Sequence, residues 1–373
     1  MFILWLGECG PGLWQWQYIV GMSEPMPNGV GDASVQLTER QKSVLSSIVQ
    51  RYVGNAEPVG SRQVSKDIVD NLSPATIRNV MSDMEEMGLI DQPHTSAGRQ
   101  PTELGFRVWV DQIMPCSPLS EQERQMVDTT LSLARTEEQL LASAALALAE
   151  VTRLLGLAIT PVLDSTRLER LELVRVGDTT LLVVASFGSG LIRSIAVETG
   201  LAIPPETLSD LVRRLHLTAL GRTPTQLDRH LKDMETSEAR PEEPYADVFH
   251  LILRSLLEVA HPVRSSDAFL QGTSHVLAQP EMGERRSMTN LMQLLEDRSQ
   301  LVQLLQERIG HDGVYITIGS ENRVEHLRPL SLVTRNYRIG DAMGAVGVLG
   351  PTRMPYAKLA SAVDYIALRL TQG

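Results

Sequence analysis

The chain has 373 residues, which is too long for one ordinary domain, so two or three domains are expected. Its hydrophobic content of 43% fits globular domains with apolar cores. The net charge of −11 argues against a protein that coats nucleic acid without sequence preference. The two cysteines, Cys9 and Cys116, lie far apart and imply no disulfide framework, which makes a reducing cytoplasm the expected location. The scattered histidines give no ligand-like spacing, so neither a metal nor a cofactor is expected.

The N-terminal residues differ in composition from the rest of the chain. They include three of the four tryptophans, Trp5, Trp14 and Trp16. No Lys or Arg precedes Arg40, and Glu8 and a Gly-Pro-Gly run interrupt the apolar residues, unlike a secretory signal or a membrane span. We therefore interpret residues 1–36 as a disordered or wrongly included leader, with Met22 or Met26 as the true start.

After this leader the sequence predicts three helices. The run LTERQKSVLSSIVQRYV has apolar residues at helical spacing behind Thr38, which can cap the helix. Ser61 is predicted to cap a second, short helix, RQVSKDIV. The third helix is predicted to begin with Ser73 as cap and Pro74 in the first turn, and to stop at Gly88.

The third predicted helix has one apolar face and one face suited to DNA bases. The apolar face contains Ile77, Val80, Met81, Met84 and Met87. The opposite face contains Ala75, Thr76, Arg78, Asn79 and Ser82. Because a helix fits the major groove, where Arg pairs with guanine and Asn with adenine, Arg78 and Asn79 are the predicted base readers, with Ala75, Thr76 and Ser82 nearby. The alternative is an ordinary solvated face. Ser61 and Arg62 are predicted to contact phosphate.

A wing is predicted after the third helix. LIDQP is predicted to form a short strand, HTSAGRQPT a polar loop, and the following residues a helix through Val108 to Ile113. This order is typical of a winged helix-turn-helix, which we place at residues 37–114. Gly98 would give the loop a flexible turn, and a surface hairpin is the alternative interpretation. The predicted DNA contacts of the wing are His94, Thr95, Ser96 and Arg99.

The charge of this module favours a dimer. Residues 37–114 contain eight Lys or Arg against ten Asp or Glu, a net charge of −2 with histidine neutral. Phosphate neutralisation supplies most non-specific DNA affinity, so one copy should hold DNA weakly. Two copies on a palindromic site would place two recognition helices about 34 Å apart.

The rest of the chain predicts an α+β domain with an insertion. Residues 136–157 are predicted to form a long helix, followed by three strands, LERLELVRV, TTLLVVASF and LIRSIAVE. Residues 206–261 are predicted to be mainly helical, and MTNLMQLLEDRSQLVQLLQERI to be one helix. Three more strands, GVYITIG, LSLVTRNYRIG and AMGAVGVLG, and a helix from Pro355 complete the chain.

The motifs resemble one family throughout. The segments EPVGSR, LSPATIRN and PHTSAGR, followed by FLQGTSHVLAQPE, VYITIGSEN and YRIGDAMGAVGVLGPTRMPY, closely resemble the HrcA family of heat-inducible transcription repressors. The resemblance runs from about Leu37 to the C-terminus. It implies an α+β fold with an N-terminal winged helix-turn-helix and a GAF-like α/β domain that carries an inserted dimerisation domain. By position, the GAF-like domain would comprise residues 121–202 and 309–373, and the inserted dimerising domain residues 203–308.

The resemblance also implies a function. Such a protein is a homodimer that binds double-stranded DNA at an inverted-repeat operator called CIRCE, represses chaperone genes and is released on heat stress. A GroEL-type chaperonin would keep it in its DNA-binding form, and no membrane is involved.

The sequence leaves two alternative functions to compare with repression. In a metabolite-responsive winged-helix regulator, a ligand would occupy the GAF-like domain and raise the melting temperature. An enzyme finds little support, because the GSGL at 188–191 lies between strands and not ahead of a helix, where a phosphate loop belongs. Arg353 at a helix start could bind an anion, although helix capping by Thr352 is the plainer interpretation.

Overall fold

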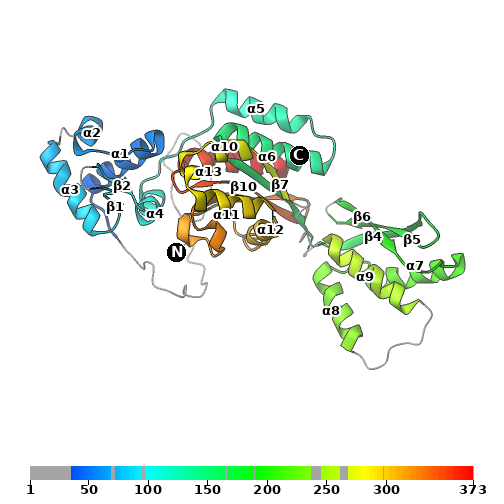
Figure 1. Ribbon diagram of the computed structural model, residues 1–373. Coiled ribbons are helices and arrows are strands. Elements are labelled where there is room, and N and C mark those ends of the chain that lie inside the picture. Colours follow the sequence, from blue (N-terminus) through cyan, green and yellow to red (C-terminus); the bar gives the residue numbers. More distant parts are fainter. Residues whose placement is uncertain are drawn as a thin grey trace.

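The computed structural model describes residues 35–68, 72–94, 97–163, 166–188, 190–236, 245–260, 268–296 and 298–372. The interpretation of residues 1–36 as a leader therefore concerns residues that lie almost entirely outside the described part. The described chain is an α+β protein with an N-terminal winged helix and a C-terminal α/β region, as the sequence predicts (Figure 1).

The winged helix contains the predicted helices and the strand predicted in LIDQP, and it adds a second strand, β2, within the segment predicted to be a loop. Its elements are α1 (Glu39–Asn55), α2 (Ser61–Asp67), α3 (Pro74–Glu86), β1 (Ile90–Asp91), β2 (Gln100–Pro101) and α4 (Glu103–Gln112). Thr38 caps α1 and Ser73 caps α3 with side-chain oxygens, as predicted. The predicted cap at Ser61 is wrong. Gly60 is the residue at the N-cap of α2, and it has no side chain that could cap the helix. The Gln63 side chain accepts the Gly60 N–H at 2.8 Å.

An antiparallel sheet of five strands, drawn from distant parts of the chain, forms the centre of the C-terminal region. Its strand order is β7-β3-β10-β9-β8, with β3 (Leu155–Val162), β7 (Ala268–Gln271), β8 (Val314–Thr317), β9 (Leu330–Ile339) and β10 (Ala342–Pro351). The helices of this region are α5 (Glu121–Ser132), α6 (Glu137–Thr152), α10 (Thr273–Leu277), α11 (Arg285–Glu296), α12 (Ser299–Gln306) and α13 (Tyr356–Gln372). Short 3-10 turns lie at Pro280–Gly283, Gly319–Glu321 and Glu325–Leu327.

Helices cover both faces of this sheet. Val346 and Val348 of β10 pack with buried residues of α6 and α13 on one face of the sheet. Ala345 and Leu349 of the same strand pack with buried residues of α11 and α12 on the opposite face. Alternate residues of a strand face opposite sides, so a strand between two helical layers must be apolar throughout. That explains why AMGAVGVLG reads as a continuous apolar run.

A second lobe is inserted between two neighbouring strands of the sheet. β3 ends at Val162, β7 starts at Ala268, and these two strands pair with each other, so the chain between them leaves the sheet and returns to it. The lobe contains a three-stranded sheet and three helices with a core of their own. Its elements are β4 (Leu168–Arg175), β5 (Thr180–Phe187), β6 (Ile192–Glu198), α7 (Pro205–Ala219), α8 (Pro224–Thr236) and α9 (Ala246–Ala260).

The structure places the insertion differently from the sequence interpretation of 203–308. Strands β4 to β6, which we assigned to the first part of the main domain at 121–202, belong to the lobe. Helices α11 and α12, which we assigned to the insertion, cover the main sheet. The alternation of apolar residues identifies a strand but does not say which sheet it joins. The single helix expected at 288–309 is two helices. The helix expected at 136–157 ends at Thr152, and its last expected residues belong to β3, a strand that the sequence did not predict.

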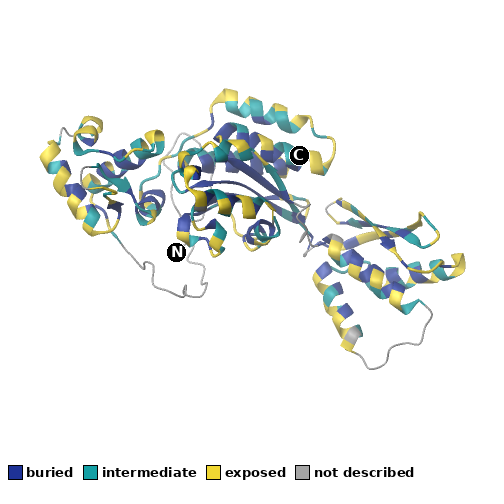
Figure 2. Ribbon diagram, in the orientation of Figure 1, coloured by how far each residue is buried: buried dark blue, intermediate teal, exposed yellow. Residues whose placement is uncertain are grey.

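The winged helix and the main sheet share one apolar core. Leu45 of α1, Phe106 of α4 and Val363 of α13 belong to the same cluster of buried residues. Figure 2 shows buried residues in dark blue on both the winged helix and the α/β region. The Phe106 ring lies edge-on to Tyr356 at 5.8 Å between centroids and contacts Tyr52 at 6.4 Å. The winged helix, which we call the reader, is therefore packed against the α/β region and is not merely joined to it by the chain.

No helix of the described residues is both long and apolar enough to cross a membrane.

The shared core predicts joint unfolding. Phe106→Ala removes a buried ring between the two regions and should cost about 3–5 kcal/mol. In scanning calorimetry it should lower the melting temperature of one transition that contains both the winged helix and the main sheet. Phe187→Ala, in the separate core of the lobe, should lower a different transition. Separate melting of the winged helix and the sheet would contradict this prediction.

Candidate nucleic-acid interface

Helix α3 is fixed by a capped start and a buried face. The Ser73 hydroxyl accepts the Thr76 N–H at 3.1 Å, and Pro74 occupies the first turn, where its missing N–H has no cost. Ile77, Val80, Met81 and Met84 are buried against α1 and α2, as their spacing predicts. This burial sets the rotation of the helix and therefore decides which side chains point outward.

The outward face of α3 contains most of the predicted base readers. Ala75, Arg78, Asn79 and Ser82 are exposed, and Thr76 is half-buried with its hydroxyl 3.0 Å from that of Ser73. Arg78 and Asn79 make no ion pair or side-chain hydrogen bond within the described part of the chain. Their donors are therefore free for an outside acceptor, and no carboxylate of the first turn competes for them.

Helix α2 adds cations to this surface. Arg62 and Lys66 are exposed and make no ion pair with a described residue, and Ser61 is half-buried at the first position of the helix. Sequence reasoning had named Ser61 and Arg62 but passed over Lys66. Its position one helical turn beyond Arg62 gave the missing signal, since residues four apart share a face.

The wing is anchored to the body of the domain by its backbone. Val59 and Arg99 exchange two backbone hydrogen bonds of 2.8 and 2.9 Å, beside the β1–β2 pair. This approach requires a glycine at 98, since a Cβ atom there would lie 2.5 Å from the Val59 carbonyl carbon. Gly98 therefore serves close packing, where the sequence suggested only a flexible turn.

The wing residues divide into three cases. The guanidinium of Arg99, predicted to reach DNA, is held by Glu85 of α3 at 2.8 and 2.9 Å, so it fastens the wing to the recognition helix. His94 is exposed at the loop. Thr95 and Ser96 lie outside the described residues, so their predicted phosphate contacts stay predictions.

An ion pair that the sequence does not reveal joins α1 to α2. Asp67, the last residue of α2, accepts from Arg51 of α1 at 2.6 Å and from the Ser47 hydroxyl at 2.6 Å. The Arg51 hydrogen bond lowers the pKa of Asp67, and the Ser47 bond adds to the effect. Two of the acids and two of the cations counted from the sequence, Asp67 with Arg51 and Glu85 with Arg99, are thus paired inside the module.

The comparisons with known proteins agree with this architecture. Residues 36–112 match the family model of the winged helix-turn-helix transcription repressor, HrcA DNA-binding. Residues 138–360 match the HrcA protein C terminal domain, which spans the main sheet together with the inserted lobe. The chain belongs to the HrcA family. This is a family of transcription repressors, not of enzymes.

Relatives match nearly the whole chain. The heat-inducible transcription repressor HrcA of Desulfitobacterium hafniense is 33% identical over 91% of this chain and 98% of its own length. That of Geobacter sulfurreducens is 33% identical over 90% and 99%. A crystal structure of a hypothetical protein at 2.2 Å covers 90% of this chain and 98% of its own, with a TM-score of 0.57 and 24% identity, and so supports the fold.

Removing the Asp67 charge should loosen the interface in a pH-dependent way. Asp67→Asn should lower the free energy of unfolding at pH 7 by about 1 kcal/mol, because the pair is about one-third exposed. The pKa of Asp67 is lowered by folding, so its contribution is complete above the usual Asp value of about 3.9 and disappears as the pH falls below it. Urea unfolding at pH 7 and pH 3 measures this. Glu39→Gln, which breaks an exposed pair on α1, is the control and should change little at either pH.

Proposed function

We propose that this chain is a heat-inducible repressor of chaperone genes that binds the CIRCE inverted repeat as a homodimer. The observation that carries the proposal is the outward face of α3, where Arg78 and Asn79 stand unpaired at the start of a rigidly packed helix. The N-terminal turns of a recognition helix are the part that reaches base edges in the major groove. Ala75, Thr76 and Ser82 would lie close to the bases or the backbone beside them.

Phosphate contacts would come from α2 and the wing. Ser61, Arg62 and Lys66 lie on α2, the helix before α3. In helix-turn-helix proteins this first helix crosses the DNA backbone. His94, with Thr95 and Ser96, would follow the neighbouring groove. Arg99 supports this indirectly, since its pair with Glu85 neutralises a carboxylate on the recognition helix and fixes the wing.

A dimer is supported by the surface of the inserted lobe. Several of its apolar side chains are exposed: Val174, Val176, Ile192, Leu201 and Leu217. The faces of β4 and β6 that point away from the lobe's own core carry Val174 and Ile192, beside half-buried Leu182 and Val184 of β5. A group of exposed apolar side chains favours a protein partner. We therefore propose the lobe as the dimerising domain, and the main sheet with its helices as the GAF-like domain.

Heat release and chaperonin dependence complete the proposal. The reader shares its core with the α/β region, so loss of packing there would disturb the reader as well. A change of one or two kcal/mol shifts a folded population severalfold, which is enough to relieve repression. A GroEL-type chaperonin would return the released chain to its DNA-binding form in the cytoplasm.

The assignment of base and phosphate contacts is tested with two arginines. On a CIRCE duplex, Arg78→Ala should cost about 1–3 kcal/mol of binding free energy and relax preference at one base pair. On a scrambled duplex it should change affinity little. Fluorescence anisotropy with both duplexes measures the two effects.

Arg62→Ala is the matched control, since this arginine is also exposed and unpaired but faces phosphate in the proposal. It should weaken binding to both duplexes alike and reduce the salt slope by about one. Equal binding of the unaltered chain to CIRCE and scrambled DNA would overturn the proposed function. Equal losses for Arg78→Ala on both duplexes would overturn only the role of that residue.

The dimer surface is tested by placing a charge on it. Ile192 is 65% exposed, so Ile192→Glu should leave the lobe folded and shift the chain towards monomer in sedimentation velocity. Affinity for CIRCE should fall with it, since two linked readers bind far more tightly than one. Leu133→Glu, at a site that is 75% exposed just after α5, should leave the dimer intact. An unchanged dimer in the Ile192 variant would refute the lobe surface.

A further inference from the structure

We infer that Arg107 and Glu321 are positioning residues that lock the DNA reader at one orientation to the α/β region, and that this lock sets which half-site spacing the protein accepts. The inference rests on the proposed function, because only a dimer on an inverted repeat has a spacing to select. Neither residue reads DNA in this scheme. They act through the angle at which α3 is presented.

The covalent connection cannot set this angle. Helix α4 ends at Gln112 and α5 begins at Glu121, and the intervening residues 113–120 form neither helix nor strand. A connector of this length allows many orientations unless non-covalent contacts select one. The contacts that α4 makes therefore decide how the reader is held.

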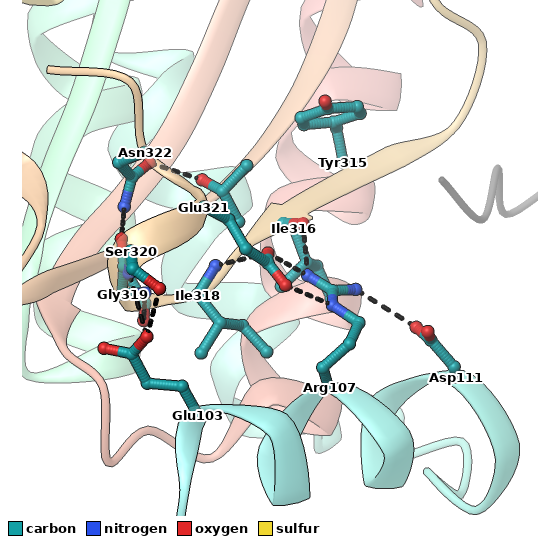
Figure 3. Close-up of polar contacts among 12 residues, drawn as sticks. Glu103, Arg107, Asp111, Tyr315, Ile316, Ile318, Gly319, Ser320, Glu321 and Asn322 are labelled. Atoms are coloured by element: carbon teal, nitrogen blue, oxygen red, sulfur yellow. Dashed lines mark hydrogen bonds and ion pairs between the residues drawn. The ribbon is translucent and has the colours of Figure 1, made fainter. Parts of the chain in front are cut away.

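Arg107 makes the strongest of these contacts (Figure 3). It donates from Nε and Nη2 to the two carboxylate oxygens of Glu321 at 2.8 and 2.6 Å. Nη2 also donates to the Ile316 carbonyl at 2.8 Å, and Nη1 to Asp111 at 3.1 Å. A two-pronged guanidinium–carboxylate pair fixes direction as well as distance. Burial by itself would lower the pKa of Arg107, but Glu321 more than compensates and the pKa is raised.

The turn that carries Glu321 is itself rigid. Asn322 is buried, and its Nδ2 group donates to the carbonyls of Gly319 at 3.0 Å and Leu330 at 2.7 Å. The Thr317 hydroxyl donates to its side-chain oxygen at 2.7 Å, and the Ile318 N–H donates to Glu321 at 2.8 Å. The lock therefore joins α4 to a fixed point of the sheet region.

A second contact lies one helical turn before Arg107. Glu103 accepts from both the backbone N–H and the hydroxyl of Ser320, with 3.0 Å to the backbone nitrogen. A Cβ atom at Gly319 would lie 2.0 Å from a carboxylate oxygen of Glu103, and the backbone there has φ of +54°. Glycine at 319 therefore accommodates both the left-handed backbone and the Glu103 carboxylate that lies against it.

A third contact lies at the other edge of the reader. Arg353 donates from Nη1 to the Val53 carbonyl near the end of α1 at 2.6 Å and pairs with Glu281 at 2.6 Å. The Arg353 guanidinium, which the sequence suggested as an anion-binding group, is therefore occupied by these two contacts. With contacts on α4 and α1, the reader cannot rotate without breaking charged hydrogen bonds. In a dimer, both readers would consequently have one fixed separation.

The test compares half-site spacings. Three duplexes are needed: the CIRCE repeat, the same half-sites moved by half a helical turn (about 5 base pairs), and a single half-site. The unaltered chain should prefer the first over the second strongly. Glu321→Gln and Arg107→Ala should reduce that preference at least tenfold while binding the single half-site as before. Arg107→Lys should recover part of the preference, since it keeps the charge but loses the fork.

Glu123→Gln is the matched control. Glu123 pairs with Lys358 at 2.6 Å and is about as exposed as Glu321, but both partners lie within the α/β region. This variant should keep the full spacing preference. Gly319→Ala provides an independent variant, because it pushes Glu103 away without removing a charge, and it should relax the preference as well. Circular dichroism melting identifies any variant that fails to fold, and the remaining ones then carry the test.

The outcomes separate cleanly. Undiminished spacing preference in the folded Arg107 and Glu321 variants overturns the positioning role and leaves the proposed function intact. Equal relaxation in Glu123→Gln also overturns it, since general loosening would then be the cause. If the unaltered chain does not distinguish CIRCE from scrambled DNA, the proposed function fails and the inference fails with it.

Discussion

Helix α4 has to bury two faces at once, and the arrangement of the rest of the molecule depends on this. One face closes the winged helix, where Gly105 lies against the Leu89 carbonyl so closely that a Cβ atom would come within 1.9 Å. The other face meets the α/β region through the Phe106 ring and the Arg107 guanidinium. A ten-residue helix could not be stable alone, so tertiary contacts on both sides must supply its stability. The DNA reader and the α/β region are joined through it.

The distribution of charge resolves an apparent conflict in the reader. The winged helix has more acidic than basic residues, so its net charge alone would disfavour binding to DNA phosphates. In the folded molecule, Asp67 and Glu85 are paired inside the winged helix, and Glu103 and Asp111 face the α/β region. The cations of α2 and α3 are left on the opposite side. A net charge says little about a binding surface until the structure shows which groups share a face.

The inserted lobe is a topological device as much as a second domain. Because β3 and β7 are neighbours in the sheet, the lobe enters and leaves the main region at adjacent points, and the sheet closes without it. The lobe can therefore bind a partner through its surface without any change in the main sheet. One ion pair, from Arg193 of β6 to Glu137 at the start of α6 at 2.6 Å, links the lobe back to the body. Dimerisation through the lobe and DNA reading through the winged helix would then communicate through the central sheet.

The sequence by itself determined the helices of the winged helix, the strands β4 to β6 and β8 to β10, the outward face of α3 and the family, but not α5, α10, β2, β3 or β7. The features that it determined depend on short-range rules, namely capping residues, apolar spacing and turn-forming residues, which can be read within a few turns of chain. Only the tertiary structure decided which sheet β4 to β6 join, where the insertion begins, and what Arg99, Arg107 and Arg353 bind. Their partners, Glu85, Glu321 and Val53, lie up to three hundred residues away. An arginine is free for DNA or consumed by a carboxylate according to contacts that no local pattern encodes.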